Sequence, residues 1–477
     1  MVAYERLDFD SDQAIVGLMA KHLSEFKTFP LFFYGQHYML GVQAWIAVPF
    51  FWLGGPTVAM LRAPLVIINC VVAVLLLWHI TRSAGSPWLA FAAVLPFAAA
   101  SPVLSANLLE TLGASVEPFL YLLLLWTLRD RPLAFGLVLG VGFLHREFTI
   151  FAVAGVAVAT YRETGRSHLA NYNWVLRAAL GFAAVWLIVD QLKQRINTMG
   201  PPGGAVATAP LTLQLHTLFS RVVIAPSMVL PKLRQAITDV LPDLLGMRAV
   251  EPLRYNINAT VAVGTAVIGV ALAAAGAICV IRLLALSRRR RRQGLGFAPL
   301  PSPFCTYMAV VGLQAFLAYS LSDAVDPRFP AILRYALLAV FLPIALFTAF
   351  FEVETRRSWR AVVGVLLALS AVLNTRDSWR IIDEYRRTPT PSEHRILADD
   401  LVAHHIEYGT GTYFDTYITD FFARERVILH SSDKVRIAAY EALVTANAST
   451  AVRIVRQPCS VGRPVASSWC LVDPLNR

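Results

Sequence analysis

Ten apolar runs between residues 57 and 374 constrain the fold of this chain more than any other feature of its sequence. The runs lie at about 57–80, 87–104, 112–128, 132–144, 147–161, 175–193, 259–286, 304–320, 333–351 and 361–374. About 20 apolar residues in a helix cross the hydrocarbon core of a bilayer, and only helices and closed barrels satisfy every backbone group there. Because 56% of the residues are hydrophobic and only 15% are charged, against nearly a quarter charged in soluble proteins, we predict an all-α polytopic membrane protein with about ten spans.

Three of the apolar stretches are too short to cross a bilayer straight. The runs 132–144 and 147–161 are interpreted as kinked half-spans that meet at His145-Arg146-Glu147. A further apolar stretch, 41–54, is short and is interrupted by Pro49. We therefore expect it to lie in the membrane interface.

The arginines between the runs follow the positive-inside pattern, in which cytoplasmic loops are rich in Lys and Arg. Alternate loops carry Arg82; Arg129 and Arg131; Arg162, Arg166 and Arg177; Arg288 to Arg292; and Arg356, Arg357 and Arg360. The opposite, outer side then receives the first outer loop 1–56, residues 105–111, His145 to Glu147, the loops 194–258 and 321–332, and the tail. This distribution accounts for the net charge of +11, so we expect membrane lipid and not nucleic acid as the partner, with Arg288 to Arg292 as a topological anchor on anionic lipid.

The layout makes the chain begin on the outer side without a preceding span. We therefore expect a first transmembrane helix upstream, missing from this sequence.

The tail differs sharply in composition from the rest. Helix-like stretches (Glu393 to His404, Lys434 to Thr445) alternate with strand-like ones (Arg426 to Leu429, Ala451 to Val455). We predict two domains, a transmembrane domain at 1–375 and a small extracytoplasmic α/β domain at 376–477. Cys459 and Cys470 form a disulfide if the tail faces an oxidising compartment and are otherwise two free thiols.

Three acids crowd the first outer loop, Asp8, Asp10 and Asp12, and an amphipathic run follows them. Such acids can simply cap a helix. Carboxylates beside a bilayer can also take a proton from an acceptor hydroxyl or share a divalent cation. A run of polar and aromatic residues follows at Tyr34-Gly35-Gln36-His37-Tyr38.

Charged groups at membrane depth are costly and are usually functional. His145-Arg146-Glu147 is either an ordinary polar turn or a phosphate-binding Arg146 with His145 and Glu147 as metal or hydrogen-bond partners. Glu117, favoured over Glu110, is either a cap or part of the site. Arg334-Tyr335 opens a span on the outer side, against the positive-inside trend. The pair either contacts lipid headgroups or forms a phosphate-binding site.

The segment FDSDQAIVGLMAKHL, followed by FFYGQHYMLGVQAWIAVPFFWLGGPTVAMLRAP, resembles the start of GT-C membrane glycosyltransferases. These include protein O-mannosyltransferases, the lipid A aminoarabinose transferase and bacterial relatives. The resemblance is clearest over residues 8–66 and extends weakly to Tyr413-Phe414-Asp415-Thr416-Tyr417 and Glu425-Arg426-Val427. Gln13 replaces the family's usual acid, His37 its proline, and the first span is missing.

The resemblance implies a GT-C fold and inverting transfer of a sugar from a polyprenyl-phosphate donor to an acceptor hydroxyl or amine. Asp12 would be the general base, with Asp10 as runner-up. The expected substrate-binding residues are Arg334, Tyr335, Arg146, His145, Glu147, Glu117, Tyr34, Gln36, His37 and Tyr38. The sequence leaves metal dependence open, and Asp10, Glu147 and His145 could hold a divalent cation.

We expect an integral protein of a bacterial inner or plasma membrane, part of the cell-envelope machinery, whose active site faces outward. The acceptor could be a protein, a lipid or a polysaccharide. Two other functions stay open: a transporter or flippase of lipid-linked sugars, and a non-catalytic membrane scaffold with a binding tail. A transporter would favour acids within the spans and an internal repeat, and the sequence has few of the former and no visible repeat.

Overall fold

The structure is a computed structural model. It describes residues 2–5, 9–36, 39–112, 115–196, 226–248, 265–292, 301–322, 332–389, 391–459, 462–466 and 468–472.

Six helical stretches in the described part are long and apolar enough to cross a membrane. They are α3 (Val58–Ala84), α9 (Tyr172–Ile196), α14 (Ala266–Arg292), α15 (Pro303–Leu321), η5 with α16 (Leu333–Val340 and Phe341–Val353) and α17 (Arg357–Arg387). A bent pair, α4 (Pro87–Ala98) and α5 (Pro102–Leu108), makes a seventh if it is counted as one span. The mostly helical membrane fold is thus confirmed, with six or seven full-length crossings at the ten apolar runs.

The span expected at 87–104 is bent, because α4 and α5 meet at an angle of 77°. Proline has no N–H to donate, and Pro102 opens α5 while the Ser101 side chain caps it by accepting a hydrogen bond from Leu104 N at 3.1 Å. The two helices are therefore separately initiated.

Shorter helices occupy three of the remaining runs. They are α6 (Glu117–Thr127), α7 (Pro132–His145) and α8 (Phe151–Thr164), with 3-10 turns η1 (Glu147–Ile150) and η2 (His168–Ala170). The break expected at His145-Arg146-Glu147 separates α7 from α8. Helix α7 packs closely on α9, since a Cβ on Gly136 would lie 2.0 Å from the carbonyl oxygen of Ala178.

The N-terminal stretch contains α1 (Ser11–Ser24) and α2 (Val42–Gly54), with Pro49 inside α2. Between α9 and α14 the structure describes α12 (Pro226–Gln235), the π-helical turn η3 (Ala236–Val240) and α13 (Leu241–Leu244). The remainder of the predicted loop 194–258, apart from the end of α9 and residues 245–248, lies outside the described residues.

The tail forms an α/β unit. Its elements are α18 (Glu393–Ala403), β1 (Tyr408–Gly411), α19 (Tyr413–Phe422), β2 (Ile428–Ser431), α20 (Ala438–Ala446), β3 (Val452–Arg456), β4 (Arg463–Val465) and β5 (Trp469–Val472). The sheet has the order β2-β1-β3-β5-β4, with β1 parallel to β2 and β3, and β5 antiparallel to β3 and β4. Cys459 and Cys470 form a disulfide.

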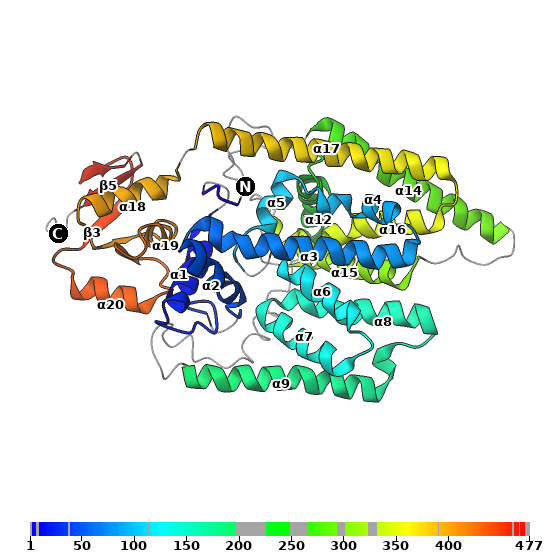
Figure 1. The fold of residues 1–477 in the computed structure, drawn as a ribbon, viewed down its shortest axis with the longest axis horizontal. Coiled ribbons are helices and arrows are strands. Elements are labelled where there is room, and N and C mark those ends of the chain that lie inside the picture. Colours follow the sequence, from blue (N-terminus) through cyan, green and yellow to red (C-terminus); the bar gives the residue numbers. More distant parts are fainter. Residues whose placement is uncertain are drawn as a thin grey trace.

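The α/β unit lies at one end of the helix bundle, and α1 and α2 lie beside it (Figure 1). One buried cluster joins α1 to α19 and the sheet, whereas a second cluster fills the membrane helices. Helix α17 runs on to Arg387 and so crosses the expected boundary at residue 375. The first outer loop therefore shares its core with the tail, which brings the two ends of the chain together.

Candidate active site

Asp10 and Asp12 stand at the start of α1 in different environments. Asp10 is the N-cap residue, and its carboxylate accepts a hydrogen bond from Gln13 N at 2.9 Å. The capping interpretation therefore holds for Asp10. Asp12 lies two residues further on and accepts a short hydrogen bond through Oδ1 from the Tyr413 hydroxyl of α19.

Close packing of α1 on α19 explains this contact. The Ser11 hydroxyl donates to Tyr413 O at 2.6 Å. Further along, a Cβ on Gly17 would lie 2.5 Å from the Phe421 ring, so only glycine lets the helices approach this closely. Phe9 packs against Phe421 and Phe422. The tail thus holds the Asp12 carboxylate in place.

Arg334 at the start of η5 faces the same region. Its guanidinium lies 5.4 Å from the ring centroid of Tyr335. The carboxylates of Asp10 and Glu110 are close enough to interact with it electrostatically. Arg334 therefore faces one acid of the first outer loop, Asp10, and one acid that follows α5, Glu110.

Two cations of the tail, Lys434 and Arg436, complete the region and were not expected from the sequence. Lys434 Nζ lies 4.6 Å from the Tyr413 ring centroid, and it interacts electrostatically with both Asp12 and Arg334. Burial and the neighbouring Arg436 lower the pKa of Lys434. These residues follow β2, about 400 positions from Asp12, so no local pattern could have connected them.

Arg436 connects the polar and aromatic run at residues 34–38 to the tail through hydrogen bonds to Gly35 and Gln36. Its guanidinium donates to Gly35 O at 3.2 Å and, with the amide oriented to accept, to the Gln36 side chain at 3.1 Å. Gly35 has φ +68 and would place a Cβ 3.0 Å from Arg436 Cα, which explains the glycine. His37 and Tyr38 lie outside the described residues.

A second polar group forms around Glu117, which is buried at the start of α6. Ser115 donates to its Oε2 at 3.3 Å, and Gln43 of α2 donates to Glu110 O at 3.4 Å. Arg146 donates to Leu112 O at 2.6 Å and interacts electrostatically with Glu117. Because Glu110 also faces Arg334, the two groups are contiguous.

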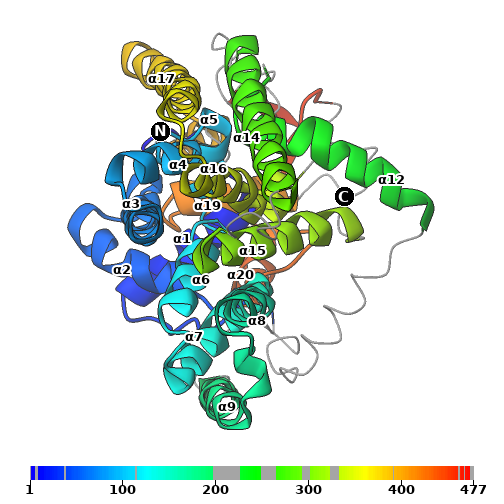
Figure 2. The ribbon, with the colours of Figure 1, turned by 90° about the vertical axis from the view of Figure 1, so that its right-hand side faces the viewer.

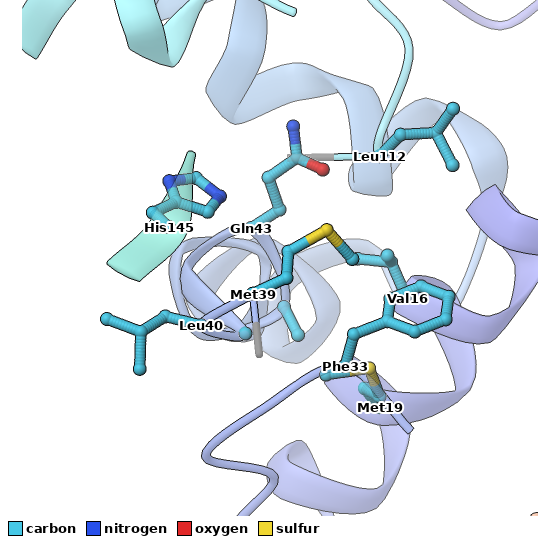
Figure 3. A pocket seen from close by; sticks show the side chains of 10 residues that line it. Val16, Met19, Phe33, Met39, Leu40, Gln43, Leu112 and His145 are labelled. Atoms are coloured by element: carbon cyan, nitrogen blue, oxygen red, sulfur yellow. The ribbon is translucent and has the colours of Figure 1, made fainter. Parts of the chain in front are cut away.

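His145 is buried at the end of α7 beside this group. Its Nδ1 lies 3.0 Å from the Tyr121 hydroxyl, while Nε2 has no hydrogen-bond partner among the described residues. A cavity of about 10 Å³ adjoins it, lined by His145, Gln43, Leu112 and apolar side chains of α1, of α2 and of the segment between them. Figure 3 shows His145 and Gln43 on one side of this cavity and Phe33 and Met19 on the other. This volume is close to what one buried water needs.

Tyr34 belongs to a different network. Its hydroxyl lies 2.9 Å from His22 Nδ1, and His22 Nε2 lies 2.8 Å from Glu425 of the tail. Glu425 also accepts from Lys21 and, at 2.7 Å, from Tyr440. Burial alone would raise the pKa of Glu425, but these bonds outweigh it and hold that pKa well below its usual value.

Glu147 opens η1, and within the described ranges its side chain makes no hydrogen bond or ion pair. Asp10, Glu147 and His145 do not come together, and no three His, Cys, Asp or Glu side chains of the described residues form a group that could hold a metal ion.

No protein-family model matches the sequence, and neither does any curated protein sequence. Solved structures do match. ArnT from Cupriavidus metallidurans in the apo state superimposes with a TM-score of 0.60 and 12% identity, over 99% of this chain and 95% of ArnT. The structure of ArnT bound to undecaprenyl phosphate gives 0.59 and 11% over the same shares. This likeness establishes the fold, which is the GT-C fold that the sequence resemblance predicted.

Proposed function

We propose that this chain, which has the fold of a GT-C membrane protein, transfers a sugar from a polyprenyl-phosphate donor to an acceptor hydroxyl or amine. The observation that carries the proposal is that Lys434 interacts electrostatically with both Asp12 and Arg334 where α1, η5 and the tail converge. An acid beside two cations suits a reaction in which a nucleophile loses a proton and a phosphate leaves. The undecaprenyl phosphate bound to ArnT supports the choice of donor.

In the proposed mechanism Asp12 is the general base. The acceptor oxygen or nitrogen attacks the anomeric carbon, its proton passes to Asp12, and the bond from that carbon to the phosphate oxygen breaks. The electron pair leaves with the polyprenyl phosphate, whose charge Arg334 and Lys434 balance. Attack opposite the leaving group inverts the anomeric centre.

The Tyr413 hydroxyl acts as a positioning group. It occupies Asp12 Oδ1 and so leaves Oδ2 to take the proton. Burial and the Asp12 charge raise the pKa of Tyr413, so the phenol keeps its proton and stays a donor near neutral pH. Asp10 is less suited to act as base, since its carboxylate caps α1.

Arg146, Glu117 and His145 are proposed to bind the donor rather than to react. They lie beside Glu110, which faces Arg334. Tyr34, Gln36, His37 and Tyr38 remain proposed binding residues, together with Tyr335 and Glu147. A divalent cation is not required by this mechanism.

Two features support an outward-facing site in a plasma membrane. The disulfide between Cys459 and Cys470 lies in the tail, and disulfides persist in oxidising compartments. Several arginine-bearing ends lie at the far end of the bundle from the tail, as Figure 1 shows for the start of α9 and the ends of α14 and α8. By the positive-inside rule that end is cytoplasmic.

The test is donor turnover by the full chain in nanodiscs. A panel of radiolabelled undecaprenyl-phosphate sugars is added with a membrane extract that supplies acceptors, and free undecaprenyl phosphate is measured. We expect release by the unaltered protein and none by Asp12→Asn, while Asp12→Asn still binds donor. Asp399→Asn, which removes an exposed acid of α18, is the matched control and should keep full activity.

Full activity of Asp12→Asn would remove Asp12 from the mechanism. Donor binding without release by the unaltered protein would instead favour the transporter or scaffold.

A further inference from the structure

A second cavity lies at the end of the bundle away from the tail. It has a volume of about 360 Å³ and is enclosed by the C-terminal ends of α3, α6 and α8 and by the start of α15. Figure 1 places the end of α3 opposite the α/β unit, and Figure 2 looks onto that end of the molecule. The volume falls in the usual range of small-molecule pockets, about 300–1,000 Å³.

Two arginines stacked on tryptophans form the cationic part of the lining. Arg82 Cζ lies 4.1 Å from the Trp78 ring centroid, and Arg129 Cζ lies 4.2 Å from that of Trp126. Stacking holds a guanidinium by its face. Apart from the bond that Arg129 Nη1 donates to Trp126 O at 3.2 Å, it leaves the N–H edges available. His79, buried beside them, lies 3.1 Å from Thr127 Oγ1 through Nε2.

The charge of the lining favours an anion. In the part of the chain that the structure describes, Arg82 has no carboxylate within ion-pair distance, and Arg129 has only its exposed neighbour Asp130, at 3.8 Å. Glu163 is the acid of the lining. Two guanidiniums therefore face one carboxylate, and the planar N–H fork of arginine matches the oxygens of a phosphate.

Helix α3 connects this cavity to the candidate active site and fixes its depth. Near the start of α3, the Arg62 guanidinium lies 5.7 Å from the ring centroid of Phe9, next to Asp10. Arg82 follows 20 residues later, which is about 30 Å along a helix and equals the thickness of the hydrocarbon core. The cavity is thus level with the phosphates of the other leaflet.

We propose that this cavity binds the phosphate headgroup of an anionic lipid from the leaflet opposite the candidate active site. The two arginines bind the phosphate oxygens, and Trp78 and Trp126 hold the guanidiniums. The site is independent of the proposed transferase reaction, because none of its residues lies near Asp12. A soluble phosphate ester has the same recognised group, so the experiment separates the two sources.

The test titrates the full chain in a non-ionic detergent and counts bound ligand by native mass spectrometry. Short-chain phosphatidylglycerol is compared with phosphatidylcholine of the same chain length and with inorganic phosphate. The variant Arg82→Gln/Arg129→Gln is compared with Arg453→Gln/Arg463→Gln, which removes equal charge from exposed positions on β3 and β4 of the tail.

We expect saturable binding of phosphatidylglycerol at one site. At about 5-fold per arginine, the cavity variant should bind it about 30-fold more weakly, while the matched variant binds as the unaltered protein does. Competition by inorganic phosphate at similar concentrations would keep the phosphate site but assign it to a soluble ester. Equal binding of the two lipids, or equal weakening in the two variants, would overturn the proposal.

A second measurement uses only the unaltered protein, so it does not depend on whether a variant folds. A photoreactive phosphatidylglycerol is cross-linked to the unaltered protein, and the labelled peptides are sequenced. Labelling at 78–83 or 126–129 supports the site, and labelling only elsewhere refutes it.

Discussion

Replacing Tyr413 by Phe tests how the tail controls the candidate base. The substitution removes the hydroxyl that donates to Asp12 Oδ1 and keeps the ring on which Lys434 stacks at 4.6 Å. Tyr413 is only 3% exposed, so water has little access to replace the lost donor. The change is therefore confined to the contacts of that hydroxyl, which also interacts with Arg436, and the bond to Asp12 is the one that holds the carboxylate.

The size of the effect follows from the strength of that bond. A hydrogen bond to a charged group is worth about 1.5–3 kcal/mol. Without it, the Asp12 carboxylate is free to turn toward Lys434, with which it interacts electrostatically. If the reaction needs the present orientation of the carboxylate, the full free energy of this hydrogen bond is added to the activation barrier. The value of kcat/KM then falls about 10- to 100-fold.

The assay is the release of undecaprenyl phosphate from the donor that the panel identifies. Tyr408→Phe is the control, because Tyr408 lies on β1 and its hydroxyl makes no hydrogen bond within the described residues. Donor KM should change little in Tyr413→Phe, since the loss lies in kcat. Unchanged kcat/KM in Tyr413→Phe would refute the positioning role.

Three further predictions concern the frame of the site. Glu425→Gln should lower the free energy of unfolding by about 3 kcal/mol at pH 7, because buried partners lose their counter-charge. The pKa of Glu425 is depressed in the folded protein. The stability difference between the variant and the unaltered protein, measured by thermal unfolding, should therefore shrink as pH falls below about 4. Gly136→Ala should cost about 1–3 kcal/mol by forcing α7 from Ala178 of α9, whereas Gly276→Ala, with nothing within 4 Å of its Cβ, should not destabilise. Lys434 has a lowered pKa, so activity that needs its charge should fall with rising pH below the range of an ordinary lysine, about 10.4, and Lys434→Arg should move that alkaline limb to higher pH.

The membrane helices were predictable because their signal is local. Each apolar run reports its own burial in lipid, and helices were found at the positions of all ten runs. The sequence did not predict that the run 87–104 forms two helices. Pro102 and the Ser101 cap start the second helix within that run. The short strands were only partly predictable, since β1 reads Tyr-Gly-Thr-Gly and carries no alternating apolar pattern.

The candidate site was predictable on one side only. The Asp10 and Asp12 pair and Arg334 stand out because charge is rare in an apolar chain. Lys434 and Arg436 lie in a polar tail where cations are ordinary, and only the return of the tail onto α1 makes them notable. Family resemblance had pointed to Tyr413 without indicating what it contacts.

Helix α1 couples the position of the Asp12 carboxylate to the packing of the tail. One turn of it presents Asp12 to Tyr413, and the following turns bury Gly17 against Phe421 and join Lys21 to Glu425. These contacts share one core, so a change that loosens the tail from α1 must also displace the Asp12 carboxylate. Loss of activity in tail variants is therefore expected even where the substituted residue touches no substrate. Such variants should regain turnover when α1 and the tail are cross-linked in their native register, which a direct role in chemistry would not allow.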